Sequence, residues 1–121
     1  MKCLLTGGCG FAGHHFAEHI LKTTDWDVVI FDKLTYASRG LDRLSYLGDY
    51  DPERLQVFTV DISKPISEGV KREVGKVDYI LHVAGETHVD RSIVDPYPFI
   101  EANIIGTYNM LQYSRSSINL P

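Results

Sequence analysis

Apolar positions along the chain occur either as short continuous runs or with the spacing of helices. Four runs, at 2–6, 27–32, 55–60 and 77–83, are rich in aliphatic residues and phenylalanine. Continuous apolar runs of this length are typical of strands that are covered on both faces of a parallel sheet. The sequence therefore predicts four buried strands.

A helical pattern follows the first run, over residues 11–23. Ala12, Phe16 and Ile20 recur there at every fourth position, which predicts an amphipathic helix with these three side chains facing the core.

Three more helices are predicted between or after the strands. They span 41–47, 63–74 and 96–114, the second ending at Gly75 and the third following Asp95 as its N-cap. The resulting order alternates strands with helices throughout, which predicts an α/β fold with a doubly wound parallel sheet. In the order 3-2-1-4-5-6 of such sheets, the fourth strand would be an open edge, so we expect the sheet to be incomplete at its C-terminal side.

Composition and charge exclude several classes of protein. The 121 residues are 44% hydrophobic and 23% charged, as expected for one globular domain, and the net charge of −4 argues against nucleic acid or an anionic membrane as a partner. No apolar run approaches the ~18 residues of a membrane-spanning helix. The first residues also lack the apolar core of a signal peptide. We therefore expect a cytoplasmic protein in which Cys3 and Cys9 are reduced thiols.

The glycines after the first strand carry the strongest chemical signal. Gly8, Gly10 and Gly13 form a G-x-G-x-x-G between a predicted strand and a predicted helix, the setting in which this motif binds a dinucleotide. The glycines allow a tight turn and a close approach of the backbone to a pyrophosphate at the helix N-terminus. The P-loop motif is absent from the sequence, which excludes a P-loop nucleotidase.

The second strand ends in an acidic residue. Asp32 stands where the dinucleotide fingerprint has a carboxylate that binds the adenosine ribose. Because a carboxylate repels a 2′-phosphate, NAD is predicted in preference to NADP. Lys33 and Arg39 are either solvated surface charges or soften that repulsion.

Three stretches resemble a known family. Residues 6–13 (TGGCGFAG) are similar to the opening of the extended short-chain dehydrogenases/reductases. Residues 32–37 (DKLTYA) and 84–93 (AGETHVDRSI) resemble, more narrowly, the dTDP-glucose 4,6-dehydratases of that family. The resemblance covers nearly the whole chain and implies a Rossmann fold that binds NAD.

The resemblance also implies site residues. It places NAD contacts along the glycine turn, the end of the second strand, the end of the third strand and the segment after the fourth, and a substrate contact at Thr87. In chain order these residues are Gly7, Gly10, Phe11, Ala12, Gly13, Asp32, Lys33, Leu34, Thr35, Asp61, Ile62, Val83, Ala84, Gly85, Glu86 and Thr87. Ala102 stands where the family often has a cofactor-contacting threonine, so no contact is expected there.

Other polar residues have plainer interpretations. His15 and His19 share a helix face but lack further ligands, so no metal site is expected. His82 is interpreted as a hydrogen-bonded core residue, and His88 as either a structural residue or a neighbour of the substrate. Asn103 is predicted to point toward the core, and the resemblance implies a bond to the main chain near the active site. The alternative is a partly exposed amide.

The catalytic residues of the family have no counterpart here. None of the seven tyrosines is followed four residues later by lysine, so the Tyr-x-x-x-Lys pair is missing. We therefore expect residues 1–121 to be the N-terminal part of an NAD-binding domain, inactive alone, with the catalytic helix and the substrate domain elsewhere in a longer enzyme.

The resemblance implies that this enzyme is a lyase of nucleotide-sugar metabolism in deoxysugar biosynthesis. It would convert dTDP-glucose to dTDP-4-keto-6-deoxyglucose through oxidation at C4, loss of water across C5 and C6, and hydride return to C6. The alternatives are an epimerase or decarboxylase acting on a UDP- or GDP-sugar, and a non-catalytic NAD-binding module. A homodimer is also expected, because the last helix carries apolar residues on a second face: Phe99, Ile104, Ile105, Tyr108 and Tyr113.

Overall fold

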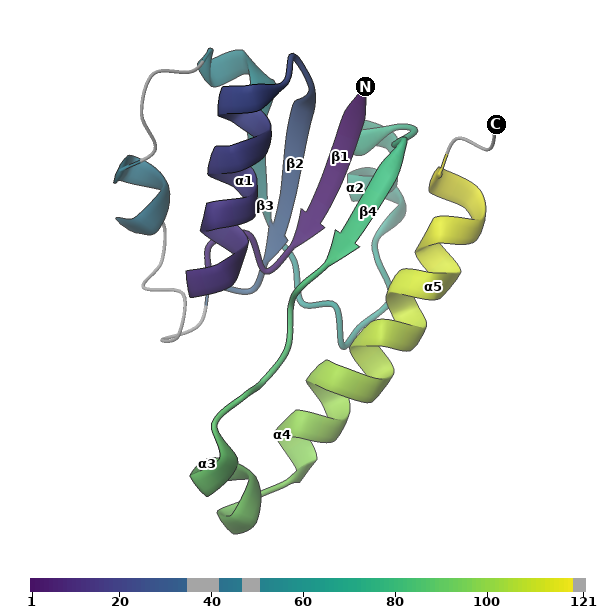
Figure 1. The fold of residues 1–121 in the computed structure, drawn as a ribbon. Coiled ribbons are helices and arrows are strands. Elements are labelled where there is room, and N and C mark those ends of the chain that lie inside the picture. Colours follow the sequence, from purple (N-terminus) through teal and green to yellow (C-terminus); the bar gives the residue numbers. More distant parts are fainter. Residues whose placement is uncertain (35–41, 47–50, 119–121) are drawn as a thin grey trace.

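The fold is built on a four-stranded parallel sheet with the order β3-β2-β1-β4, seen in a computed structural model that describes residues 1–34, 42–46 and 51–118 (Figure 1). The strands are β1 (Lys2–Thr6), β2 (Asp27–Asp32), β3 (Leu55–Thr59) and β4 (Tyr79–His82). The predicted doubly wound fold is thereby confirmed as a partial Rossmann fold.

The sheet separates two apolar cores, because successive side chains along β1 and β2 point to opposite faces. Cys3 and Leu5 face the layer of α1 (Phe11–Thr23), whereas Leu4 faces the opposite layer, which contains α2 (Glu68–Val74) and α5 (Gly106–Ser117). Figure 1 shows α1 on one face of the sheet and α2 and α5 on the other. Because β1 and β2 are covered on both faces, their apolar residues run without interruption, as the sequence predicts.

The predicted core stripe of α1 is confirmed at Ile20 but wrong by about one residue position at Ala12 and Phe16. Ala12 and Phe16 are exposed, and the buried residues of the helix are Gly13, Ala17, Ile20 and Leu21. The reason is tertiary, because the backbone of Gly13 packs directly on the glycine turn and so determines which face of the helix meets the sheet.

The helix predicted over 63–74 begins later, at Glu68. Ser67 caps it, with its Oγ accepting a hydrogen bond from Val70 N–H at 3.2 Å. Residues 61–63 instead form a turn in which Ser63 donates to Asp61, which keeps the segment out of the helix.

The segment predicted as helix over 41–47 contains a 3₁₀ helix, η2 (Asp42–Tyr46), with Leu44 buried in the core. Leu41, Leu47 and Gly48 lie outside the described residues, as do Thr35 and Arg39. A second short 3₁₀ helix, η3 (Pro52–Arg54), leads into β3.

The fourth strand is shorter and more exposed than predicted. Only 79–82 are in β4, and Tyr79 at its start is 46% exposed, with its ring stacked on that of Trp26. Before β4, an isolated bridge joins Val77 to Ile118. The chain then forms a short helix that the sequence pattern did not indicate, α3 (Val89–Val94).

The last predicted helix has three parts. They are α4 (Tyr97–Phe99), a π-helical segment η4 (Ile100–Ile105), and α5, which ends at Ser117 rather than at Ser114. Asp95 accepts a hydrogen bond from Tyr97 N–H at 3.3 Å, but Pro96 holds the N-cap position. A π-helical segment inside a helix is frequently found at functional sites.

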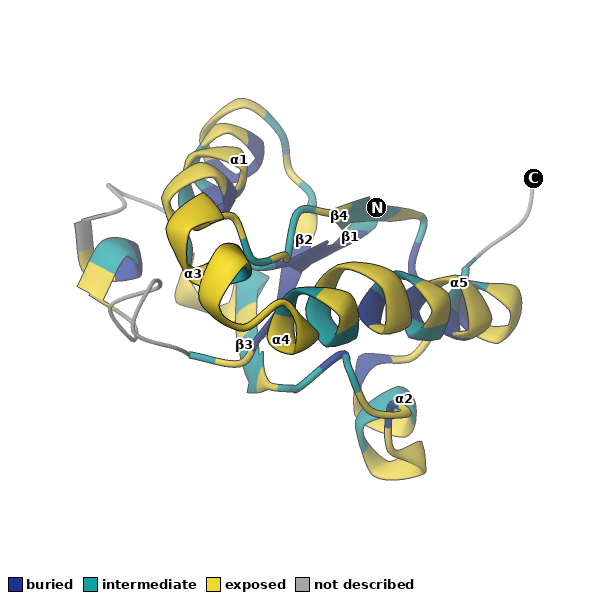
Figure 2. Cartoon of the chain, turned by 90° about the horizontal axis from the view of Figure 1, so that it is seen from below, coloured by how far each residue is buried: buried dark blue, intermediate teal, exposed yellow. Residues whose placement is uncertain are grey.

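Figure 2 shows that much of the surface of this last helix is exposed, and large apolar residues are among its exposed side chains. Ile104 and Tyr108 are 63% and 58% exposed, whereas Tyr113, which the sequence assigned to the same surface, is 1% exposed and belongs to the core. Tyr113 packs edge-on against Phe31. Among the described residues, no helix is long and apolar enough to cross a membrane.

Candidate cofactor site

A cavity of about 690 Å³ lies at the carboxyl ends of the strands. Its lining residues follow all four strands and include the start of α1 and part of η4. Small-molecule sites typically have volumes of about 300–1,000 Å³. In a doubly wound sheet, the position between β1 and β4 is the switch point at which ligands bind.

The glycine turn forms the floor of this cavity. Gly7 has φ +72°, and a Cβ there would lie 2.8 Å from Ala84 Cα. At Gly13 a Cβ would lie 2.0 Å from the carbonyl oxygen of Gly7. The turn can therefore close only with glycine at both positions, which leaves the N-terminal N–H groups of α1 beside the cavity. Such groups, together with the helix dipole, favour a phosphate.

Asp32 connects this turn to the end of β2. The residue is 8% exposed, and its carboxylate accepts hydrogen bonds from Cys9 N–H at 2.9 Å and from Leu34 N–H at 2.7 Å. A carboxylate has about four lone-pair sites, so both oxygens can still accept from a hydroxyl group. The carboxylate is therefore held in place and remains available on the cavity side.

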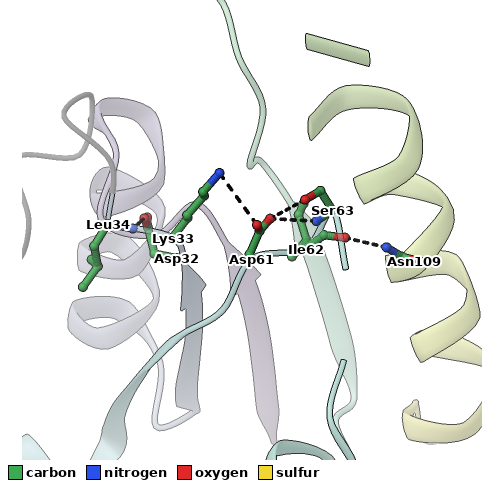
Figure 3. A network of polar contacts seen from close by, with 7 residues as sticks. All are labelled: Asp32, Lys33, Leu34, Asp61, Ile62, Ser63 and Asn109. Atoms are coloured by element: carbon green, nitrogen blue, oxygen red, sulfur yellow. Dashed lines mark hydrogen bonds and ion pairs between the residues drawn. The ribbon is translucent and has the colours of Figure 1, made fainter. Parts of the chain in front are cut away.

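A second carboxylate, that of Asp61, also lines the cavity, and Figure 3 shows it between Lys33 and Ser63. Asp61 Oδ1 accepts from both N–H and Oγ–H of Ser63, and its Oδ2 lies 3.7 Å from Lys33 Nζ. Burial raises the pKa of Asp61, but the hydrogen bonds from Ser63 and the charges of Lys33 and Lys64 outweigh it, so the net pKa is lowered. The group is therefore an ionised acceptor at neutral pH.

The backbone beside Asp61 is held from the opposite layer. Asn109, on α5, donates from Nδ2 to the carbonyl oxygen of Ile62 at 2.8 Å (Figure 3). This contact fixes the end of the third strand relative to the last helix. Asn109 is not predicted as a site residue, because nothing in the helical pattern shows which carbonyl group its amide meets.

The wall after β4 is held by two side chains. Thr6 Oγ1 accepts from the N–H groups of Val83 at 3.0 Å and Ala84 at 3.1 Å. Asn103 accepts from Glu86 N–H at 2.8 Å and donates to Glu86 C=O at 3.0 Å. Asn103 thus bonds the main chain as the resemblance implies, although its amide is exposed rather than directed into the core.

The structure brings nearly all the expected contact residues together. Every one of them lines the cavity except Leu34, whose side chain packs against the core under α1, and Thr35, which lies outside the described residues. Thr87, expected to contact substrate, is exposed at the rim beside His88.

The cavity also has lining residues that were not predicted from the sequence. Three of them, Val60, Ser63 and Lys64, flank the predicted residues Asp61 and Ile62. Their position in the sequence next to these two residues could have indicated that they line the cavity. Ala102, on η4, lines the cavity although no contact was expected there. The position of η4 beside the cavity depends on how the last helix packs, which the sequence does not show. The remaining missed residues are Phe31, Arg43, Pro98 and Glu101.

The two cysteines add no nucleophile to the site. Burial raises the pKa of Cys3 to about 11, and burial together with the Asp32 carboxylate raises the pKa of Cys9 to about 12. Both are free thiols that stay protonated at neutral pH and are therefore unreactive. In the described part of the chain, no three His, Cys, Asp or Glu side chains are grouped so that they could hold a metal ion.

Comparison with known proteins agrees with this geometry. Residues 4–120 match the family model described as GDP-mannose 4,6 dehydratase. The chain belongs to this family. The resemblance to the extended short-chain dehydrogenases/reductases that residues 6–13 carry is thereby confirmed.

Several relatives of the chain share one activity. The dTDP-glucose 4,6-dehydratase of Escherichia coli is 42% identical over 116 residues, and that of Neisseria meningitidis serogroup B is 40% identical over 115 residues. These matches cover 96% and 95% of this chain but 31% and 32% of the relatives. The chain therefore spans about a third of the length of the curated relatives it matches.

Solved structures of similar proteins have the same fold. DesIV, a dTDP-glucose 4,6-dehydratase from Streptomyces venezuelae with NAD and TYD bound, has a TM-score of 0.76 and 38% identity, and the match covers 94% of this chain and 35% of DesIV. A UDP-glucose 4-epimerase from Thermus thermophilus in complex with NAD has a TM-score of 0.73 and 29% identity, and the match covers 95% of this chain and 34% of the epimerase.

Proposed function

We propose that this chain is the NAD-binding part of a nucleotide-sugar 4,6-dehydratase. The observation that carries the proposal is the arrangement of the glycine turn, Asp32 and Asp61 around one cavity at the sheet switch point. The glycine turn, which a Cβ at Gly13 would fill, fits a pyrophosphate. The held carboxylate of Asp32 fits the adenosine ribose hydroxyls, and Asp61 fits a hydrogen-bond donor such as the adenine amino group.

The remaining cofactor contacts follow from the same arrangement. Phe11 and Ala12 would lie at the pyrophosphate, and Lys33 near the ribose. The segment 83–87 would cover the nicotinamide half, with Thr87 at the substrate sugar. NAD, when bound, supplies the acceptor and donor for hydride. The residues of this chain bind and orient it, and we propose that residues 1–121 are the N-terminal part of the cofactor domain.

The proposed substrate is dTDP-glucose, and the proposed product is dTDP-4-keto-6-deoxyglucose. The overall change is oxidation at C4, loss of water across C5 and C6, and reduction at C6. Support comes from the dTDP-glucose 4,6-dehydratases at 42% and 40% identity, compared with 29% for the UDP-glucose 4-epimerase. The acid and base for these steps lie outside residues 1–121, because the sequence contains no Tyr-x-x-x-Lys pair.

A turnover assay tests this function. The complete protein, incubated with NAD and dTDP-glucose, is expected to form a 4-keto product, detected by its absorbance in alkali, whereas residues 1–121 alone form none. UDP-glucose and GDP-mannose serve as comparison substrates and should react more slowly than dTDP-glucose. Epimerisation of a UDP-sugar without dehydration would replace the proposal with the epimerase alternative. NAD binding without any turnover would indicate a non-catalytic module.

We further propose that the complete protein is a homodimer in which the last helices of two subunits pair. Ile104, Ile105 and Tyr108 are 63%, 37% and 58% exposed, and a helix that is apolar on its outer face needs a second cover. Ile104→Glu and Tyr108→Glu are expected to give a folded monomer or a weakened dimer by light scattering. Phe16→Glu, at a 46% exposed position on α1, is the control and should leave the mass unchanged. An unchanged dimer mass in the folded Ile104→Glu variant would show that this face lies outside the interface.

A further inference from the structure

Two threonine hydroxyl groups and one imidazole connect β1, β4 and α5 beside the cavity. Thr6 Oγ1 lies 2.8 Å from Nδ1 of His82, and Nε2 of His82 lies 3.0 Å from Oγ1 of Thr107. Thr6 ends β1, His82 ends β4, and Thr107 lies in the first turn of α5. Residues 83–87, which follow His82 directly, form one wall of the cavity. We call this segment the β4 loop.

The other contacts of Thr6 determine the direction of the first hydrogen bond. Its Oγ1 already accepts from the backbone N–H groups of Val83 and Ala84. A hydroxyl group has two lone pairs and one proton, and backbone N–H groups can only donate. Both lone pairs are therefore used, so the hydroxyl proton is donated to His82. Nδ1 must then be the unprotonated ring nitrogen.

The contacts of Thr107 lead independently to the same protonation state. Its Oγ1 lies 2.7 Å from the backbone carbonyl oxygen of Asn103, which can only accept. Thr107 therefore donates its proton to Asn103 and accepts from Nε2–H of His82. Hydrogen bonds therefore run in one direction from Thr6 through His82 and Thr107 to the carbonyl oxygen of Asn103. The side chain of Asn103 in turn accepts from the N–H of Glu86 and donates to its C=O, which connects this series to the β4 loop.

We propose that His82 is a positioning residue that, as the neutral imidazole with its proton on Nε2, couples the β4 loop to the last helix and so sets the wall for the nicotinamide half of NAD. The reference to NAD rests on the proposed function, whereas the coupling does not. A proton on Nδ1 would face Thr6 Oγ1, which has no lone pair left to accept it. His82 is hydrogen-bonded as expected, but it is exposed, so its assignment to the core is wrong. Desolvation of the covered part of its ring lowers its pKa and so also favours the neutral form.

Two substitutions of Thr107 separate hydrogen bonding from packing. Thr107→Val keeps the side-chain volume but loses the hydroxyl group, whereas Thr107→Ser keeps the hydroxyl group and loses a methyl group. In the complete protein, Thr107→Val is expected to weaken NAD binding about threefold to tenfold and to speed hydrogen exchange of Glu86 N–H by a similar factor. Thr107→Ser should change both by less than about twofold. A larger effect of Thr107→Ser than of Thr107→Val would show that packing, rather than the hydrogen bond, positions the β4 loop, and would overturn the proposal.

Nitrogen-15 spectroscopy of the histidines tests the protonation state directly. The His82 signals, identified by their loss in His82→Gln, should show a proton on Nε2 and none on Nδ1 near neutral pH. A proton on Nδ1 would overturn the proposal. His19→Gln, exposed on α1 and outside the cavity lining, is the matched control and should leave Glu86 exchange unchanged.

These measurements keep the two proposals distinct. The protonation state and the Glu86 exchange rate are measured without NAD. A wild-type protein that shows the expected exchange pattern but binds no NAD would therefore refute the proposed function and retain the coupling. A protein that binds NAD equally well with valine or threonine at position 107 would refute the positioning role alone.

Discussion

Replacing Gly13 by alanine is expected to cost about 3 kcal/mol or more of stability and to abolish NAD binding. The new Cβ would lie 2.0 Å from Gly7 O, 2.7 Å from Gly7 C and 2.8 Å from Gly8 Cα. All three atoms belong to the backbone, so no side chain can rotate away and the turn itself must open. The midpoint of thermal unfolding of the complete protein should fall by more than about 6 °C.

Gly69→Ala provides the matched control for this prediction. Gly69 lies inside α2, and a Cβ there would meet no atom within 4 Å. Alanine is favoured over glycine in a helix by up to about 1 kcal/mol, so this variant should be as stable as the wild type or slightly more stable. If Gly13→Ala keeps both the wild-type midpoint and NAD affinity, then the close packing of α1 on the glycine turn is not what forms the site.

Replacing Asp32 by alanine is expected to weaken NAD binding by more than about a hundredfold and to reduce the preference for NAD over NADP. The proposed contact consists of charge-assisted hydrogen bonds to two ribose hydroxyls, and such bonds contribute about 1.5–3 kcal/mol each. The substitution also leaves the N–H groups of Cys9 and Leu34 without their acceptor, which loosens the turn. Titration of both cofactors against the complete protein measures the effect.

Asp27→Asn is the control for this second prediction. Asp27 begins β2, at the end opposite Asp32, and is exposed. Its substitution removes the same charge from the same strand far from the cavity, so NAD affinity should stay within about twofold. Tighter binding of NADP than of NAD by the wild type, or an unchanged preference in Asp32→Ala, would show that Asp32 does not select the cofactor.

The sequence by itself determined the sheet, its strand order and most of the candidate site. β1 and β2 are covered on both faces, so their apolar runs are unmistakable, and α1 begins and ends as predicted, at Phe11 and Thr23. The dinucleotide fingerprint placed Asp32 at the site and the family resemblance placed Asp61 there. Both line one cavity because residues at the carboxyl ends of parallel strands meet at one edge.

Only the tertiary structure decided how the helices face the sheet and what holds the site. Periodicity places a stripe on a helix only to within about one position. The packing of Gly13 on Gly7 decided that Ala12 and Phe16 are exposed, whereas Ile20 is buried as predicted. Similarly, the bonds of Asn103 to Glu86 and of Asn109 to Ile62 join segments distant in sequence. Such pairings depend on how the last helix lies across the sheet, and no local pattern of residues shows which distant segments will meet.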